Sequence, residues 1–306
     1  MQNSNQVLDM DLTAEMEVLP SKRNTNEIIH QSEIRFFGLS RSGNHAVINW
    51  IIRQLEGSYC FLNCAELKHN PFLTARPLND QGIVFRTNME KFDLEKEQRG
   101  EISKKDYLLY NHEDCFLGAA NKKQLLEKHK QWVGQAGNRN DILILRDPFN
   151  LFASRMKSGL LRGHYTHHGV RPISLLTLKR IYKQHAREFL GEKNNLRNKI
   201  GINFNSWTRD EDYRKKIARE LGIPYSVTGL GEVPGVAGGS SFDGTRYSGE
   251  AQKMNLNSRW EHFAENEEYL SIFDTEMLDL TRKIFGEIAP LRFFEHRNHS
   301  IGVESM

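Results

Sequence analysis

The sequence predicts an α/β fold in which a parallel β-sheet carries helices on both faces. Twice, an apolar run rich in β-forming residues is followed by a short polar loop and then by apolar side chains at helical spacing, over residues 34–55 and 141–159. Strand and helix patterns then alternate along the rest of the chain, which is typical of a parallel sheet. The other expected strands are 82–86, 107–110 and 200–204, and the other expected helices are 122–133, 173–189, 210–221 and 269–285.

Each element is justified by its own residues. The first strand, 34–39, ends at Ser40, and the helix after it has apolar side chains at 46, 47, 50, 51 and 55. The second strand, 141–145, is followed by Pro148, which is favoured in the first turn of a helix. The helix over 210–221 is closed by Gly222 and Pro224. The glycine-rich stretch 230–241 predicts a flexible loop.

The domain organisation follows from composition. The chain has 306 residues with 38% hydrophobic and 26% charged residues, which is typical of a soluble globular protein. Residues 1–30 are polar and lack periodicity, so we expect a flexible N-terminal arm followed by a single domain over 31–306.

Charge and hydropathy exclude several classes of protein. The net charge is only +3 and no block of five like charges occurs, which argues against a nucleic-acid partner. No run of 18 apolar residues and no signal-peptide core are present, so we expect no membrane association and a cytoplasmic location. The odd number of cysteines, Cys60, Cys64 and Cys115, indicates free thiols in a reducing compartment.

The loop after the first strand has a spacing suited to binding an anion. Gly38 and Gly43 are separated by four residues, and such a loop can point backbone N–H groups at a phosphate where a helix begins. Nucleotide triphosphatases have Lys and then Ser or Thr after the second glycine, but Asn44 and His45 stand here. Arg41 could supply the positive charge instead. An ordinary turn in which Gly43 serves only the backbone is the alternative.

Two motifs resemble those of the PAPS-dependent sulfotransferases (PAPS, 3′-phosphoadenosine 5′-phosphosulfate). The first resembles that family's 5′-phosphosulfate loop and comprises Ser40, Arg41, Ser42, Gly43, Asn44 and His45. The second resembles its 3′-phosphate motif, in which an Arg ends a strand and a Ser follows eight residues later, here Arg146 and Ser154. The resemblance implies a P-loop sulfotransferase fold, PAPS as co-substrate, PAP (3′,5′-bisphosphoadenosine) as product, and no required metal.

Weaker matches extend the resemblance over roughly residues 34–265. Phe242 lies in a segment resembling the family's Thr-Ser-Phe, whose ring contacts adenine, and Phe204 falls where many relatives have an adenine-contacting Tyr. Either ring could instead pack in the core. In relatives, a basic residue of the C-terminal region also contacts the 3′-phosphate. The candidates here are Arg246, Lys253 and Arg259, and we favour Arg246. Ala46 departs from the adenine-stacking Trp of animal relatives.

Sulfuryl transfer needs a base and a cation at the departing phosphate. His112 directly follows a short apolar strand, as the family's catalytic His does, and Glu113 beside it is the rival base. Arg41 is placed to stabilise the leaving phosphate. Another histidine group, His164, His167 and His168, suggests zinc, but no carboxylate or Cys stands at a ligand spacing, so acceptor-pocket lining or plain surface is favoured.

The expected function is transfer of the PAPS sulfuryl group to a hydroxyl or nitrogen of a small-molecule acceptor. The acidic pair Glu113 and Asp114 would suit a cationic acceptor, such as a saxitoxin-type guanidinium alkaloid in natural-product biosynthesis. Two other functions stay open: a metal-dependent nucleotide kinase of the same topology, and a catalytically silent PAP-binding or nucleotide-binding protein.

Overall fold

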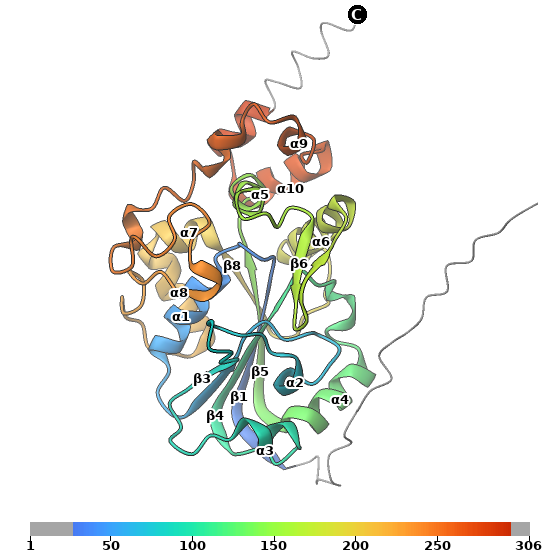
Figure 1. Ribbon diagram of the computed structural model, residues 1–306, viewed down its shortest axis with the longest axis vertical. Coiled ribbons are helices and arrows are strands. Elements are labelled where there is room, and N and C mark those ends of the chain that lie inside the picture. Colours follow the sequence, from blue (N-terminus) through green and yellow to red (C-terminus); the bar gives the residue numbers. More distant parts are fainter. Residues whose placement is uncertain (1–26, 295–306) are drawn as a thin grey trace, which may run out of the picture.

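The computed structural model describes residues 27–294. Its centre is a six-stranded sheet in the order β3-β2-β4-β1-β5-β8, with a separate two-stranded hairpin, β6-β7 (Figure 1). The strands are β1 (Ile28–Gly38), β2 (Tyr59–Leu62), β3 (Phe85–Thr87), β4 (Lys105–Glu113), β5 (Gln135–Leu145), β6 (Gly163–Thr166), β7 (Gly169–Pro172) and β8 (Lys199–Asn203).

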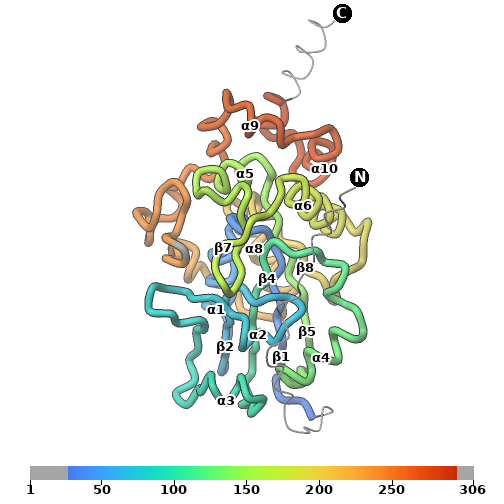
Figure 2. Tube along the Cα trace, turned by 45° about the vertical axis from the view of Figure 1, so that its right-hand side comes forward, coloured from blue at the N-terminus to red at the C-terminus, as the bar shows by residue number. Residues whose placement is uncertain are grey.

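The helices connect these strands and extend beyond one edge of the sheet (Figure 2). They are α1 (Asn44–Gln54), α2 (Pro71–Thr74), α3 (Leu94–Gln98), α4 (Lys123–Val133), α5 (Pro148–Lys157), α6 (Leu175–Phe189), α7 (Phe204–Arg209), α8 (Glu211–Leu221), α9 (Glu267–Leu270) and α10 (Thr275–Phe285). Short 3₁₀ turns lie at Leu117–Ala119, Val236–Gly238, Ala251–Lys253 and Arg259–Phe263.

The sheet is parallel except at one edge. Strands β2, β4, β1, β5 and β8 all pair in parallel, and β3 alone runs antiparallel to β2. The register pairs Gly38 with Glu113 and Leu145 with Asn203, so these strands all end at the same edge. Loops that follow the carboxyl ends of parallel strands therefore meet there, which is where ligands bind in open α/β sheets.

The alternation of side chains along β1 and β5 explains why both faces are covered. Phe36 and Ile144 pack in one apolar cluster with residues of α1 and α8, whereas Phe37 and Leu143 pack in another with Leu125 of α4. Successive residues of a strand point to opposite faces, so a continuous apolar run buries both. The expected α/β fold with helices on both faces is confirmed.

A further apolar cluster lies beyond the carboxyl edge of the sheet, where α5, α6, α9 and α10 gather (Figure 1). Phe149 and Phe152 of α5 pack there against Tyr182 of α6 and Phe273 before α10. This packing fixes α5 at the end of β5, and with it the two residues of the predicted 3′-phosphate motif.

Several predicted boundaries differ from the structure. The helix expected over 269–285 is two helices, because Asp274 accepts a hydrogen bond from the Met277 amide and starts a new one, α10. The four-residue strand β2 and the hairpin β6-β7 were not predicted; short strands carry too few residues to show a period. Of the predicted arm over residues 1–30, residues 1–26 lie outside the described part of the chain. The last residues of the predicted arm belong to β1, which begins at Ile28.

Two further expectations concern the chain as a whole. Cys60, Cys64 and Cys115 are free thiols, as the odd cysteine count indicated. Across residues 27–294, none of the helices is both long and apolar enough to cross a membrane.

Candidate active site

The loop after β1 opens toward the carboxyl edge of the sheet with several free backbone donors. Arg41 and Gly43 both adopt left-handed backbone conformations, with φ of 74° and 86°. Within the described part of the chain, the N–H groups of Gly43, Asn44 and His45 donate no hydrogen bond. Successive free amides at the start of an eleven-residue helix form an anion-binding concavity.

Glycine is required at position 43 for two reasons. Its φ disfavours any other residue, and a Cβ there would collide with the ring of Phe204. The ring of Phe204, at the start of α7, thus lies directly against the loop. The loop geometry is built by contacts far apart in sequence as well as by the local turn.

Buried groups hold the loop from beneath. Asp114 accepts a hydrogen bond from the Ser40 amide at 3.0 Å and pairs with Arg155 of α5, whose Nη1 lies 2.9 Å from Asp114 Oδ1. The same guanidinium donates to the Ser40 carbonyl at 3.2 Å. Asp114 is therefore engaged in supporting the loop, and the expectation that it joins Glu113 in an acidic acceptor surface is wrong.

Three arginines converge beside this loop. Arg146, at the end of β5, and Arg259 each donate to Ser154 Oγ of α5 at 3.2 Å. Arg146 also donates to the carbonyls of Leu256 at 2.6 Å and Arg41 at 3.3 Å. Burial and the charge of Arg259 lower the pKa of Arg146 to about 9. Ser154 is thus shared by two guanidinium groups. Arg259 also pairs with Asp243 Oδ2 at 3.2 Å, so one carboxylate offsets part of the positive charge of the three arginines.

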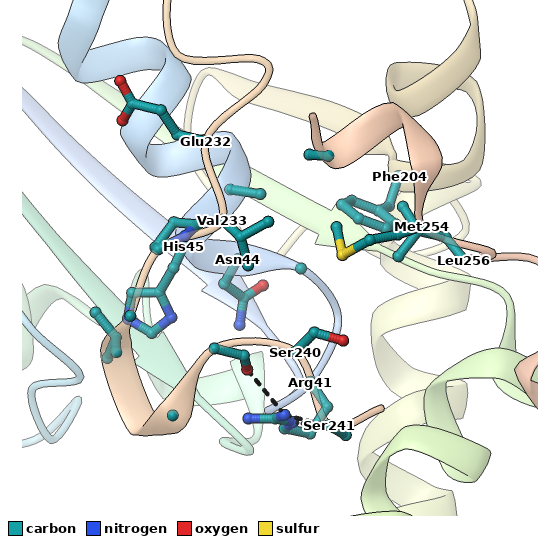
Figure 3. A pocket seen from close by; sticks show the side chains of 18 of the residues that line it. Arg41, Asn44, His45, Phe204, Glu232, Val233, Ser240, Ser241, Met254 and Leu256 are labelled. Atoms are coloured by element: carbon teal, nitrogen blue, oxygen red, sulfur yellow. Dashed lines mark hydrogen bonds between the residues drawn. The ribbon is translucent and has the colours of Figure 1, made fainter. Parts of the chain in front are cut away.

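The glycine-rich segment closes over the loop. Arg41 donates to Ser241 Oγ from Nε at 2.8 Å and to the Gly239 carbonyl at 3.1 Å, and Figure 3 shows the serine beside the guanidinium. Ser240 Oγ accepts from Arg259 at 2.7 Å. In this arrangement, hydroxyl and carbonyl oxygens of the segment occupy donors of two arginines.

A cavity of about 990 Å³ lies between these elements. Its lining includes Arg41, Arg146 and Arg259, the rings of Phe204 and Trp207, and parts of the glycine-rich segment. The two rings stack with an interplanar angle of 22°, and Arg146 lies over Phe204 at 5.5 Å. The cavity thus combines apolar walls with several cations, as small-ligand sites do.

The two candidate bases lie on opposite sides of β4. Glu113 lines the cavity, and its Oε1 accepts from Asn44 Nδ2 at 2.7 Å. His112 is 1% exposed, packs on Phe37 and Tyr110, and donates from Nδ1 to the Ala65 carbonyl at 2.7 Å. Burial lowers its pKa to about 3. The expectation that His112 reaches an acceptor is therefore not met, because adjacent strand residues face opposite ways.

The remaining residues of the loop motif have separate positions. Ser40 and Ser42 are buried, and Ser42 Oγ finds no partner among the residues the structure describes. His45 donates from Nε2 to Asn63 Oδ1 at 2.8 Å, and burial lowers the pKa of the His45 ring. Asn44 links the loop to Glu113. The Ser42 hydroxyl and the loop amides are hydrogen-bond donors without an acceptor, and a bound anion would accept their hydrogen bonds.

The predicted adenine and phosphate contacts of the C-terminal region are only partly brought together. Phe204 lines the cavity, whereas Phe242 lies outside its lining, against His262 and Arg259. Arg246 is exposed and lies over Tyr247, away from Ser154. Arg259 stands where we expected Arg246. The sequence offered both, but an irregular chain of turns between them hides which one points inward.

The histidine group after α5 is not clustered around a common point. His167 Nδ1 contacts Glu66 Oε1 at 2.6 Å, and the ring of His168 packs on His167. Among residues 27–294, no three His, Cys, Asp or Glu side chains are arranged to hold a metal ion. Tyr165, between these histidines, does line the cavity, and sequence reasoning missed it together with Trp207 and Arg76.

Comparison with known proteins gives structural likenesses only. No family model matches the sequence, and no curated protein matches it. Among solved structures, the chain is similar to the sulfotransferase domain of the Synechococcus PCC 7002 olefin synthase, with 13% identity, a TM-score of 0.41, and coverage of 84% of this chain and 96% of that one. It is also similar to mouse sulfotransferase SULT7A1 complexed with PAP, with 12% identity, a TM-score of 0.33, and coverage of 87% and 89%.

Proposed function

We propose that this protein is a PAPS-dependent sulfotransferase that moves a sulfuryl group to a hydroxyl or nitrogen of a small-molecule acceptor and releases PAP. One observation carries the proposal: Arg41, Arg146 and Arg259 reach one cavity beside a loop of unpartnered amides. Hydrogen-bond donors gather at two separate places, one at the loop and one around Ser154. This arrangement suits a nucleotide that carries two phosphate groups.

The residues divide between the two ends of such a nucleotide. The amides of the loop, Ser42 and Arg41 would bind the 5′-phosphosulfate, and Arg146, Arg259 and Ser154 would bind the 3′-phosphate. The rings of Phe204 and Trp207 offer an apolar surface for adenine. The guanidinium groups supply the neutralising charge that Mg²⁺ supplies for nucleoside triphosphates, so binding would need no metal.

In the proposed reaction Glu113, which lines the cavity, acts as the base. The acceptor oxygen or nitrogen would attack sulfur, the bond between sulfur and the 5′-phosphate oxygen would break, and the acceptor proton would pass to the Glu113 carboxylate. Arg41, which lines the same cavity, would stabilise the negative charge left on the phosphate. Asn44 holds the carboxylate through its 2.7 Å hydrogen bond and so orients it.

The first test is a calorimetric titration with PAP, ATP and Mg-ATP, with EDTA present for the nucleotides without magnesium. We expect PAP to bind without metal and more tightly than either form of ATP. Binding that depends strictly on Mg²⁺ would favour the kinase. A screen with sulfur-labelled PAPS against phenols, alcohols and amines then separates an enzyme from a silent PAP-binding protein, which would bind PAP and transfer nothing.

The second test distinguishes the two bases. Glu113→Gln should reduce sulfate transfer by about 100-fold or more while PAP affinity changes little, because a general base acts in the transition state. His112→Asn, the matched control on the same strand, should retain transfer per folded molecule. Retained activity in Glu113→Gln together with loss in His112→Asn would assign the proton to the histidine.

A further inference from the structure

One side of the cavity carries an arginine that the proposed nucleotide contacts do not use. Arg76 follows α2 and lines the cavity together with Glu113 and Tyr165 of β6. Its guanidinium carbon lies 3.9 Å from the centre of the Tyr165 ring, the distance of a stacked cation–π pair. Stacking covers the face of the guanidinium, and its N–H edge also interacts with the thiol of Cys64, another residue of the lining. A single neutral thiol leaves further N–H donors of the guanidinium for a ligand.

The backbone of Arg76 is fixed relative to the loop after β1. Its amide donates to the Asn63 carbonyl at 2.6 Å, and its own carbonyl accepts from Asn63 Nδ2 at 3.2 Å. Asn63 is buried, and its Oδ1 accepts from His45 at the start of α1. Arg76 is therefore anchored, through Asn63, to the helix that begins at the anion-binding loop.

No carboxylate of residues 27–294 lies within 4.0 Å of the Arg76 guanidinium, and the acids nearby are engaged or peripheral. Glu113 accepts from Asn44, and Glu232 pairs with Arg53 at 3.0 Å. Glu66 contacts both His167 and His69. Asp80, the other acid of the lining, is exposed. Arg76 thus adds a positive charge to the wall with no directly paired carboxylate among residues 27–294.

We propose that Arg76 and Tyr165 form an acceptor subsite for an oxyanion, so that the acceptor carries a carboxylate or a similar group in addition to the hydroxyl or nitrogen that is sulfated. This inference rests on the proposed function. The guanidinium edge matches a carboxylate bidentately, while Glu113 faces the same cavity to take the acceptor proton. A cationic acceptor would instead face Arg76 and Arg41 with like charge.

The test uses four phenols that differ in the charge of the group opposite the hydroxyl. They are the anionic 4-hydroxyphenylacetate and 4-hydroxybenzylphosphonate, the neutral 4-hydroxyphenylethanol, and the cationic 4-hydroxyphenylethylamine. Each is titrated calorimetrically into the protein with and without saturating PAP. We expect an anionic member to bind at least about tenfold more tightly than the neutral one, since charge-assisted hydrogen bonds exceed the 1.4 kcal/mol that tenfold requires. The carboxylate and phosphonate arms show which oxyanion is preferred.

Arg76→Gln should abolish that preference and leave affinity for the neutral phenol and for PAP unchanged. Arg171→Gln, an exposed arginine of β7 outside the cavity lining, is the matched control and should keep the preference. If Arg76→Gln does not fold, Arg76→Lys, which keeps the charge but loses the bidentate edge, should weaken the anions and not the neutral phenol.

Equal binding of all four phenols, preference for the cation, or no binding of any of them by the wild-type protein would overturn the subsite. So would an anion preference that persists in Arg76→Gln. Failure of the wild-type protein to bind PAP would instead overturn the proposed function, and the titrations without PAP would still decide the role of Arg76.

Discussion

Two buried arginines at different places on the sheet show how the same side chain takes different roles. Arg35 of β1 is fully buried and donates hydrogen bonds to Asp141 of β5 from Nε at 2.7 Å and from Nη2 at 2.8 Å. Arg146 is also buried, at 2% exposure, but within residues 27–294 no carboxylate lies within 4.0 Å of it. Its donors meet two carbonyls and a serine.

The difference is visible in the pKa of each group. Burial acts to lower the pKa of Arg35, but the charge and hydrogen bonds of Asp141 outweigh it and the pKa is raised. The pKa of Arg146 falls because burial and Arg259 act in the same direction. A buried ion pair is complete within the chain, whereas a buried cation without a carboxylate is stabilised by an anion from outside. Arg35 is therefore structural, whereas the missing carboxylate supports our proposal that Arg146 binds an anionic ligand.

We expect the largest effect on stability from replacing Arg35, the arginine that is paired with Asp141. Arg35→Met should lower the free energy of unfolding by about 3–5 kcal/mol, because the buried carboxylate of Asp141 is left without its partner. Denaturant unfolding of the variant and the wild-type protein measures this. The double variant Arg35→Met/Asp141→Leu should recover much of the loss. A loss below about 1 kcal/mol in the single variant would contradict the comparison.

Arg146 should show the opposite pattern. Arg146→Met should change the free energy of unfolding little, yet weaken PAP binding by about 30-fold or more, since a charge-assisted contact to a partly buried phosphate contributes about 2 kcal/mol or more. Affinity for adenosine 5′-phosphosulfate, which lacks the 3′-phosphate, should fall much less. Calorimetry measures both, with the exposed Arg180→Met on α6 as control. Equal losses for the two ligands would make Arg146 structural.

Buried histidines sharpen the comparison because, unlike these arginines, they can lose their charge at or below neutral pH. Burial lowers the pKa of His112 and His129 to about 3 and that of His185 to about 4. Below the unfolded value of about 6.5 the unfolded chain binds more protons, so stability is present above pH 6.5 and is lost as the pH falls.

The free energy of unfolding should accordingly fall by about 1.4 kcal/mol per pH unit for each of these histidines below pH 6.5. Denaturant unfolding at pH 7.0 and 5.5 measures the slope. His185→Asn should reduce the slope by the share of one histidine, whereas replacing exposed His168 by Asn should leave it unchanged. A slope that is identical in wild type and His185→Asn would mean that this ring is charged in the folded protein.

The sequence by itself determined the elements whose signals are local. The strand, loop and helix around Gly43 and those around Arg146 follow from apolar periodicity, a G-x4-G spacing and Pro148, and the structure contains both units. Arg146 and Ser154 were singled out by their resemblance to the 3′-phosphate motif, and the structure does bring the two side chains together, because a strand end and the next helical turns place residues eight apart side by side. Helices on both faces of the sheet could be predicted because β1 and β5 present apolar side chains to both faces.

Only the tertiary structure decided which neighbours face the cavity. His112 and Glu113 are adjacent in β4, and the choice between them depends on which face of the sheet other elements leave open. Arg259, and not Arg246, contacts Ser154. The irregular turns between the two arginines decide which side chain points inward, and such turns leave no periodic pattern in the sequence. The pairing of Arg76 with Tyr165 joins residues 89 positions apart, and no local pattern records a contact that is made by packing distant segments.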